Sequence, residues 1–209
     1  MKATKHLSLF FLTLLLYVTA GCSDFLYQQM NDPARDEWQQ PKAVIQALDI
    51  APGSHVADLG AGGGYFTFWL ADAVGPKGRV YAVDTDEASL TFIDNAVRQR
   101  GSPDNIELVL ATPNNPRLLP DKVDLIFICN TYHHLPERVT YFRSLSTSLR
   151  PSGRIAIIDY KDTGWAGFFG HATDKATIRQ ELESAGYRLI KDFDFLPRQH
   201  FVVFALNTP

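Results

Sequence analysis

The sequence predicts an α/β domain built on a mostly parallel, doubly wound sheet. From residue 55 onward, short apolar segments alternate with longer segments of helical periodicity, and this alternation is typical of strand–helix–strand units. The run at residues 123–129 is apolar almost throughout, as expected of a strand that helices cover on both faces. Near the end of the chain, two apolar runs flank Leu-Pro-Arg-Gln at 196–199, which indicates an antiparallel hairpin.

The first predicted element is a helix at residues 37–49. Its apolar residues, such as Trp38 and Leu48, recur at helical spacing. Pro41 then falls in the first turn, where the missing N–H has no helical partner to lose. The residues before this helix, 22–36, are polar and irregular, and we expect them to form a tether.

The remaining elements are delimited by glycine and proline. Gly-Pro-Lys-Gly at 75–78 ends one helix, Pro-Ser-Gly at 151–153 forms a turn before the fifth strand, and Gly186 ends the last helix. The predicted strands lie at residues 55–59, 79–83, 106–110, 123–129, 154–158, 187–195 and 200–206. The later predicted helices lie at residues 65–74, 87–99, 137–149 and 173–185.

The overall composition excludes several classes of protein. The chain has 209 residues, of which 45% are hydrophobic and 21% charged, so it is neither a disordered chain nor a polytopic membrane protein. A formal net charge of -3 provides no basic excess, so no nucleic-acid partner is expected. Two cysteines are too few for a disulfide scaffold. The length predicts one folded domain, which we place at residues 37–209.

An apolar leader precedes this domain. Two lysines are followed by 14 almost wholly apolar residues at 7–20, whereas a membrane-spanning helix needs roughly 20. The segment is therefore typical of a secretory signal. Thr-Ala-Gly-Cys at 19–22 resembles the end of a bacterial lipoprotein signal. In such a signal residues 1–21 are removed, and Cys22 is lipidated and becomes the new N-terminus.

The resemblance to a lipoprotein signal implies a location in the bacterial cell envelope. It implies membrane attachment through lipidated Cys22, and Ser23 implies sorting to the outer membrane with the domain on the periplasmic face. Two alternatives remain, an uncleaved inner-membrane anchor with the domain facing the cytoplasm and an ordinary signal peptide. After lipidation Cys129 is the only unmodified thiol, and we expect it to be a buried strand residue.

The main functional motif is a glycine-rich turn after the first predicted strand. Asp58, Gly60, Gly62 and Gly64 form the pattern Asp-x-Gly-x-Gly-x-Gly. Glycine tolerates positive φ and lets the backbone pass close to a ligand, and the following helix directs N–H groups at an anionic group. A dinucleotide fingerprint would need a glycine at Tyr65, and a P-loop would need Gly-Lys-Ser/Thr, so neither matches. The other alternative is a tight turn without a ligand.

An acidic residue ends the second predicted strand. Asp84 lies 24 residues after Gly60, where a carboxylate can accept two hydrogen bonds from a ribose diol. This arrangement indicates a nucleoside without identifying it. Asp86 fits the N-cap of the next helix better than Asp84 does.

Together these residues resemble the class I S-adenosylmethionine-dependent methyltransferases. Residues 124–135 are similar to the family's fourth-strand segment, and residues 149–159 are similar to the segment that enters its fifth strand. The resemblance covers residues 37–206, and the nearest group includes the quinone-biosynthesis C-methyltransferases. It implies a Rossmann-like seven-stranded sheet with a C-terminal antiparallel hairpin. It also implies S-adenosylmethionine as cofactor and a small-molecule methyl acceptor as partner.

The resemblance further implies which residues bind the cofactor. The glycine loop would approach the methionine part and Asp58 the amino group, while Asp84 would bind the ribose and Thr85 would flank the adenine. Many members carry an acid after strand three for the adenine amine; here Thr112 or a nearby asparagine could accept that hydrogen bond. The expected cofactor-binding residues are Asp58, Gly60, Ala61, Gly62, Gly64, Tyr65, Asp84, Thr85, Thr112, Asn130 and Thr131.

Three histidines are candidates for a catalytic base or a substrate contact. His133 and His134 follow the fourth strand, where open α/β sheets place their ligand crevice, and His171 lies beyond the fifth strand in an aromatic and glycine-rich stretch. Alternatively, these histidines only satisfy loop backbone groups. The adjacent pair lacks the spacing of helical metal ligands, so no metal site is predicted. The predicted function is methyl transfer; the alternatives are a noncatalytic module of the same fold and an NAD-linked oxidoreductase, which the missing glycine disfavours.

Overall fold

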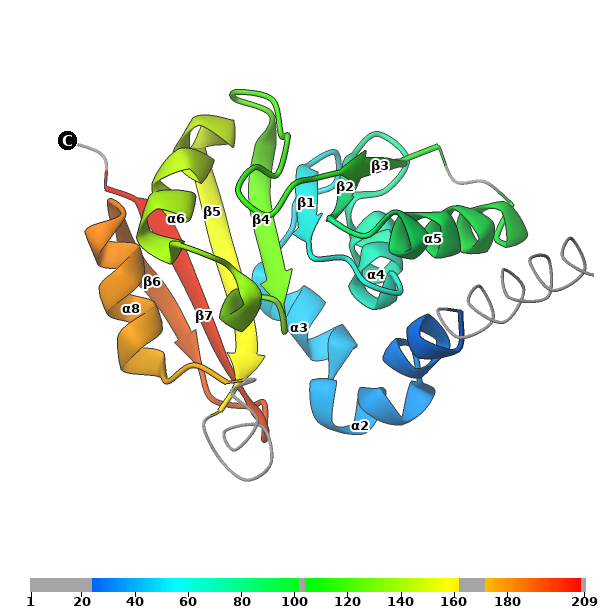
Figure 1. The fold of residues 1–209 in the computed structure, drawn as a ribbon, viewed down its shortest axis with the longest axis horizontal. Helices are drawn as coiled ribbons and strands as arrows, with labels where there is room; N and C mark the ends of the chain where they lie inside the picture. The colour runs from blue at the N-terminus through cyan, green and yellow to red at the C-terminus, as the bar shows by residue number, and fades with distance from the viewer. Residues whose placement is uncertain (1–23, 102–103, 162–171, 208–209) are drawn as a thin grey trace, which may run out of the picture.

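The protein forms one seven-stranded sheet in a computed structural model that describes residues 24–101, 104–161 and 172–207 (Figure 1). The strands are β1 (His55–Leu59), β2 (Arg79–Asp84), β3 (Ile106–Leu110), β4 (Val123–Cys129), β5 (Leu149–Tyr160), β6 (Tyr187–Phe193) and β7 (Gln199–Leu206). Their order in the sheet is β3-β2-β1-β4-β5-β7-β6. Strands β1 to β5 are parallel, and β7 runs antiparallel between β5 and β6. This arrangement confirms the predicted fold class.

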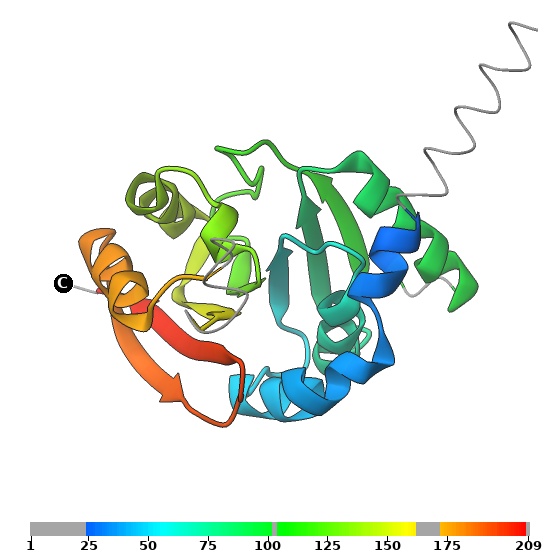
Figure 2. The ribbon, with the colours of Figure 1, turned by 60° about the horizontal axis from the view of Figure 1, so that its bottom comes forward.

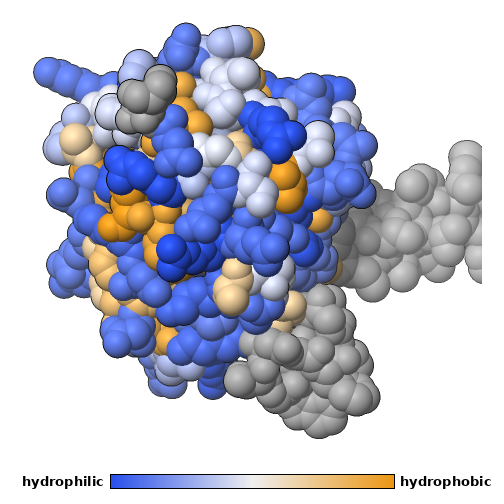
Figure 3. All heavy atoms as spheres, turned by 90° about the vertical axis from the view of Figure 1, so that its left-hand side faces the viewer, coloured by the Kyte–Doolittle hydropathy of each residue, from blue (hydrophilic) through white to orange (hydrophobic). Residues whose placement is uncertain are grey.

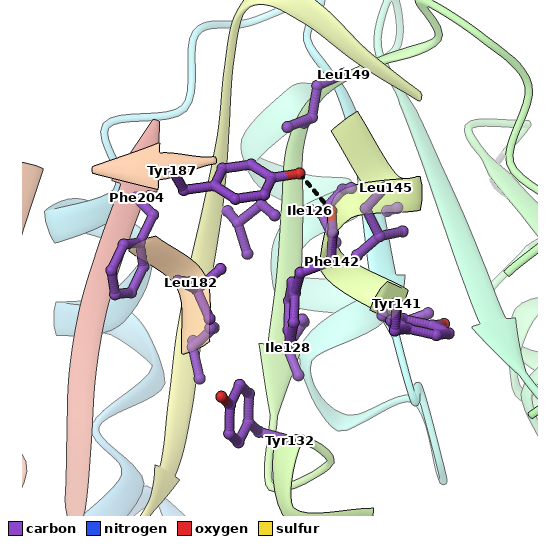
Figure 4. Close-up of a cluster of buried hydrophobic side chains, with 14 of the residues drawn as sticks. Ile126, Ile128, Tyr132, Tyr141, Phe142, Leu145, Leu149, Leu182, Tyr187 and Phe204 are labelled. Carbon is purple, nitrogen blue, oxygen red and sulfur yellow. Dashed lines mark hydrogen bonds between the residues drawn. The ribbon is translucent and has the colours of Figure 1, made fainter. Parts of the chain in front are cut away.

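The helices lie on both faces of the sheet. They are α2 (Asp36–Gln39), α3 (Pro41–Leu48), α4 (Tyr65–Val74), α5 (Glu87–Gln99), α6 (Arg138–Leu145) and α8 (Lys175–Ser184), with short 3-10 helices η1 (Pro33–Arg35), η2 (Tyr132–His134) and η3 (Ser146–Ser148). Helices α3 and α4 share one apolar core with the sheet, α6 and α8 share a second, and α5 contributes Ile93 to a small third core. In Figure 4 the second core surrounds Phe142, whose carbonyl accepts a 2.8 Å hydrogen bond from the Tyr187 hydroxyl.

The side chains of β4 show why its sequence is a continuous apolar run. Leu125 and Phe127 are buried in the core with α3 and α4, whereas Ile126 and Ile128 are buried in the core with α6. Because successive residues of a strand point to opposite faces, a central strand needs apolar residues at every position. The sheet order also places β1 and β4 side by side, with their crossovers leading to opposite edges. Ligand crevices form at such a switch point.

The edge of the sheet at β6 is polar. Arg188, Lys191 and Asp192 are exposed on this strand, and Asp192 forms an ion pair with Lys175 of α8. The corresponding side of the molecule is largely hydrophilic in Figure 3. Charged side chains on an edge strand oppose pairing with a second chain.

Several predicted boundaries are confirmed and others are wrong. The helices at 65–74 and 87–99 have the predicted bounds. The predicted helix at 37–49 is interrupted at Gln40, whose φ is 46°, because the following Pro41 disfavours helical conformation at the preceding residue. The predicted helix at 137–149 ends earlier, at Leu145 and η3.

The fifth and sixth strands also differ from their predicted bounds. The predicted turn at 151–153 lies inside β5, which starts at Leu149, pairs with Val123 and then shifts register before Leu125. A shift of this kind accommodates the proline and glycine, which a regular central strand disfavours. At the other end of the sheet, β6 stops at Phe193 instead of residue 195.

The expectation of an irregular tether at residues 22–36 is wrong for the part that the structure describes. Residues 24–30 are helical, and η1 and α2 follow. Tyr27 is 5% exposed, its hydroxyl donates a hydrogen bond to Asp86, and its ring lies 5.5 Å from that of Phe92 in α5. Tyr27 therefore holds this polar segment against α5. In Figure 2, residues 24–48 curve around the open end of the sheet from α5 toward β7.

The predicted leader and Cys22 lie outside the described residues. Among the residues that are described, no helix is long and apolar enough to cross a membrane.

Candidate cofactor and acceptor site

A cavity of about 1070 Å³ lies at the carboxyl ends of the parallel strands. Its wall combines the loops that follow β1, β2, β3 and β4 with the N-terminal segment of residues 26–38. The volume is at the upper end of the range that small-molecule sites occupy. Of the predicted residues, twelve line it: Asp58, Gly60, Ala61, Gly62, Tyr65, Asp84, Thr85, Thr112, Asn130, Thr131, His133 and His134.

The glycine loop after β1 has a backbone that requires glycine. Gly60, Gly62 and Gly64 have φ values of 79°, 53° and 79°, in the left-handed region. A Cβ on Gly60 would come within 2.2 Å of Thr131 Oγ1, so the loop passes too close to the β4 end for any side chain. Gly64 does not line the cavity: it is the N-cap of α4, where a Cβ would lie 3.0 Å from Ile93.

Asp84 joins the end of β2 to the glycine loop. Its Oδ2 accepts a hydrogen bond from Gly62 N at 2.8 Å, and its Oδ1 accepts one from Asp86 N at 3.0 Å. A carboxylate has about four acceptor sites, so both oxygens retain capacity for a ligand. Asp86 accepts from Ala88 N at 2.9 Å and caps α5, which confirms its predicted role as N-cap.

Asp58 lies beneath the loop in a buried position. It is 3% exposed, and Thr67 Oγ1 donates a hydrogen bond to its Oδ2 at 2.7 Å. Burial, opposed by the hydrogen bond from Thr67 and assisted by the negative charge of Asp84, raises the pKa of Asp58 to about 7. A carboxyl group that titrates near neutral pH can ionise when a cationic ligand group approaches.

Two residues at the end of β4 face the glycine loop. Asn130 has a φ of 55°, and its Oδ1 accepts a hydrogen bond from Gln199 Nε2 at 2.6 Å. Because its oxygen is engaged, its Nδ2 is the group left to donate to a ligand. Thr131 donates from Oγ1 to the carbonyl of Cys129 at 3.2 Å.

Cys129 was predicted to be a buried strand residue; it is the last residue of β4 and is half-buried. Gln39 Nε2 donates a hydrogen bond to its Sγ at 2.9 Å. Burial raises the pKa of the thiol to about 12, so it is protonated at neutral pH. Because only the thiolate is a strong nucleophile, Cys129 is an unreactive wall residue.

His133 is paired with an acid that was not among the predicted site residues. Its Nδ1 lies 2.8 Å from Asp159 Oδ1, and the two side chains are 5% and 0% exposed. The other oxygen of Asp159 is buried and has no hydrogen-bond partner among the described residues. The rings of His133 and His134 lie 4.1 Å apart. The sequence did contain a signal for Asp159. It lies near the carboxyl end of the apolar fifth strand, the position that Asp84 has in the second strand.

Aromatic side chains form the part of the cavity wall around Trp38, where the N-terminal segment meets the end of β5. Trp38 stacks on Tyr160 with 6.0 Å between ring centroids, and the Arg35 guanidinium lies 4.1 Å above the Tyr65 ring. The Tyr65 hydroxyl donates to Asp36 Oδ1 at 2.5 Å. Arg35 and Tyr160 were not predicted, because nothing in the local sequence shows that these segments meet.

Two other predictions have different outcomes. Thr112 lines the cavity, but its N–H and its hydroxyl both donate to the Asn115 carbonyl, at 2.9 Å and 3.4 Å, so the hydroxyl oxygen is left only as an acceptor for a ligand. His171 lies outside the described residues. Within those residues, no group of three or more His, Cys, Asp or Glu side chains is arranged to hold a metal ion.

The donors and acceptors on the wall fit S-adenosylmethionine. The cofactor has an ammonium and a carboxylate at one end and a ribose diol next to the base. On the cavity wall, Asp58 suits the ammonium, the backbone of the glycine loop suits the carboxylate, and Asp84 suits the ribose diol. The hydrogen bond between Gly62 and Asp84 shows that the loop and Asp84 are adjacent. A Cβ on Gly62 would meet only Met30 Sδ, at 3.4 Å, so that side of the loop is open.

Comparison with known proteins decides the family. Residues 50–188 match a family model described as a methyltransferase domain. The chain belongs to this family. Its fold is similar to a SAM-dependent methyltransferase from Aquifex aeolicus, with a TM-score of 0.81 and 26% identity over 88% of this chain and 98% of that one. These findings confirm the predicted enzyme class and the predicted cofactor.

Two curated relatives are similar over part of their length. Methyltransferase GfsG of Streptomyces halstedii is 31% identical over 116 residues, which are 56% of this chain and 41% of the relative. The arsenite methyltransferase of Halobacterium salinarum is 31% identical over 123 residues, 59% of this chain and 30% of the relative. The chain therefore spans less than half the length of these two relatives. The comparisons do not support the alternative of a noncatalytic module.

Proposed function

We propose that this protein transfers a methyl group from S-adenosylmethionine to a small-molecule acceptor. The observation that carries the proposal is the cavity in which the glycine loop, Asp84 and His133 share one wall. When bound, the cofactor supplies a methyl group on an activated sulfonium, so the protein mainly has to align the acceptor and remove its proton.

The residues that hold the cofactor act through charge and hydrogen bonds. The N–H groups of the glycine loop and the start of α4 favour the carboxylate end. Asp58 faces the ammonium, which stabilises the ionised form of a carboxyl group whose pKa burial raises to about 7. Asp84 accepts from the ribose hydroxyls, and Asn130 presents its Nδ2 as a donor.

His133 acts as the base in this proposal, and Asp159 positions it. An ionised Asp159 can only accept, so the 2.8 Å hydrogen bond assigns the proton to His133 Nδ1 and the lone pair to Nε2. Nε2 then takes the acceptor's proton, and the buried carboxylate stabilises the imidazolium that forms. An acid beside a histidine has this function in other enzymes that use histidine as base.

The aromatic wall supports an apolar or planar acceptor. Trp38, Tyr65 and Tyr160 provide broad apolar surfaces in the cavity that His133 also lines, and Arg35 is the only arginine or lysine among the described residues that line it. Thiols, phenols and quinols are therefore the acceptor classes to test, together with arsenite because one relative is named for it.

We further propose that Cys22 is lipidated and anchors the domain to the bacterial envelope. The apolar run at 7–20 and the Thr-Ala-Gly-Cys end of the leader support this proposal. Incorporation of a labelled fatty acid into the full chain, and its loss in Cys22→Ala, would support it. Label that persists in Cys22→Ala, or no label in either chain, would contradict it.

Isothermal titration of the full chain in mild detergent tests the cofactor. We expect S-adenosylmethionine and S-adenosylhomocysteine to bind and NAD not to bind. Turnover of labelled S-adenosylmethionine on the four acceptor classes then tests the activity. Cofactor binding without turnover on any of them would contradict the proposed acceptor chemistry.

A further inference from the structure

Exposed apolar side chains concentrate on one short helix. Five large apolar side chains are exposed in the described part of the chain, and three of them, Phe25, Leu26 and Met30, lie within residues 24–30. Phe25 and Leu26 are 62% and 52% exposed. Scattered exposed apolar residues need no explanation, but a cluster on one element indicates a binding surface.

This helix has two different faces. Tyr27 is buried against the domain, and Asn31 just after the helix donates a hydrogen bond to the Gly63 carbonyl. At the helical spacing of about 100° per residue, Phe25 lies about 160° and Leu26 about 100° from Tyr27, on the outer side, whereas Met30 lies about 60° from Tyr27, at the border of the inner face. The inner face therefore holds the helix on the glycine loop, and the outer face has no partner among the described residues.

The apolar face borders the mouth of the cavity. Leu26 and Met30 line the cavity, and Met30 Sδ is the nearest atom to a Cβ built on Gly62. In Figure 1 the helix lies at the end of the sheet where β4 and β5 terminate. Any surface that covers the apolar face would also lie next to the cavity opening.

The chain that precedes the helix indicates what covers this face. Its apolar run ends at Ala20, and Cys22 is three residues before Phe25. A chain segment of three residues spans at most about 10 Å even when fully extended. If Cys22 is lipidated, Phe25 is held within that distance of the bilayer, and if the leader stays in the membrane, the five residues from Ala20 to Phe25 set a limit of about 17 Å. Interfacial helices bury their apolar faces about 5–10 Å into the same region.

We propose that Phe25 and Leu26 insert into the membrane surface, with Met30 at the border between them and the cavity, so that the cavity opens onto the bilayer and takes its acceptor from the lipid phase. The docking surface rests on the leader and on the exposed side chains. The conclusion about the acceptor rests in addition on the proposed function. A membrane-dissolved acceptor with a planar head group would enter beside Met30 and reach the aromatic wall without crossing water.

Depth-dependent fluorescence tests the docking surface. Phe25→Trp and the control Leu119→Trp are made in the full chain, because both parent side chains are 62% exposed and Leu119 precedes β4, at the opposite end of the sheet. Each protein is incorporated into vesicles of phosphatidylethanolamine and phosphatidylglycerol whose acyl chains are brominated. Relative to the parent chain, we expect the Phe25→Trp signal to be quenched at least twofold and the Leu119→Trp signal to be unchanged.

Two results would overturn the proposal. Equal quenching in both variants would mean that the domain lies on the membrane without a preferred face. Absence of quenching in Phe25→Trp would mean that water, or the leader itself, covers this side chain. Cofactor titration of the same variants is a separate measurement, so the docking surface and the proposed function can fail independently.

The class of acceptor is tested with the variant Phe25→Ser, because Phe25 is exposed and is not among the residues that line the cavity. Two quinol acceptors with the same head group are compared in these vesicles, one with a long isoprenoid chain and one without. We expect kcat/KM to fall about tenfold or more for the long-chain quinol only. An equal fall for both quinols, or for neither, would contradict delivery from the bilayer.

Discussion

The carboxylate of Asp84 accepts a hydrogen bond from the backbone N–H of Gly62, with 2.8 Å between Oδ2 and N. This contact joins the two strongest signals in the sequence, which lie 22 residues apart along the chain. It places the acidic end of β2 directly beside the bare loop after β1. A nucleoside with a charged amino-acid tail can therefore contact both at once.

Asp84→Ala should weaken S-adenosylmethionine binding by about tenfold to a hundredfold. Hydrogen bonds to a charged acceptor contribute about 1.5–3 kcal/mol, and the substitution removes the acceptor for the ribose together with the support of Gly62. Titration calorimetry measures the effect. Asp94→Ala is the matched control, since Asp94 is an acid on the following helix that pairs with Arg98 at the surface. Parent-like affinity in Asp84→Ala would mean that the ribose assignment is wrong.

Gly60→Ala should abolish cofactor binding and destabilise the fold by several kcal/mol. The new Cβ would lie 2.2 Å from Thr131 Oγ1, in addition to the strain of a φ of 79°. Gly53→Ala separates these effects, because Gly53 has a φ of 88° but a Cβ added there would meet nothing within 4 Å. That control should lose only about 1 kcal/mol from backbone strain. Chemical denaturation of both variants measures the difference, and equal losses would contradict the close approach of the two loops.

The buried Asp58 should make stability fall as the pH rises from about 4 to about 7. Its pKa is about 7 in the folded chain and 3.8 as its ordinary value, so the folded state binds more protons between these limits. The stabilising contribution is complete below the lower value and is lost as the pH rises through the upper one. Its full size is on the order of 4 kcal/mol.

The control for this pH dependence is Asp58→Asn, which keeps the shape of the side chain and an oxygen for Thr67. Urea denaturation at several pH values compares the two chains. We expect the parent to lose stability relative to Asp58→Asn across this interval. A constant difference between them would show that Asp58 does not titrate there.

Asp159→Asn should lower kcat most for acceptors that must lose a proton. The neutral amide no longer stabilises the imidazolium at His133, so the loss should reach about tenfold or more for a phenol. It should be small for an acceptor that is already ionised at the assay pH. The KM for S-adenosylmethionine should not change.

A surface acid provides the control for Asp159. Asp192→Asn breaks only the pair with Lys175, far from His133 in the sheet order, and should turn over every acceptor like the parent. Equal losses for the two kinds of acceptor in Asp159→Asn would assign Asp159 a structural role and contradict its function as a positioning residue.

The sequence was informative where local rules decide the structure. The strand at Ile106–Leu110 and the helix at Glu87–Gln99 have the predicted bounds because apolar periodicity and the Asp86 cap define them locally. The glycine loop was predictable because glycine adopts positive φ values without strain and lets the backbone approach a neighbouring loop closely. Asp84 was predictable because parallel strands bring their carboxyl ends to the same edge.

The missed features depend on contacts between distant segments. Asp159 is 26 residues from His133, and only the parallel pairing of β4 with β5 brings them together. Arg35 meets Tyr65 because the N-terminal segment folds back over the cavity, which a polar stretch with a single buried Tyr27 did not indicate. The break at Gln40 was overlooked although Pro41 supplies its cause.

The central claim is that Asp84 and the glycine loop bind the two ends of one adenosyl amino acid. A crystal structure of the chain with S-adenosylhomocysteine tests it most directly. We predict that the ribose hydroxyls contact the Asp84 carboxylate and that the amino-acid end lies against residues 60–64. Density for the nucleoside at another place, or none in this cavity at saturating concentration, would contradict the account.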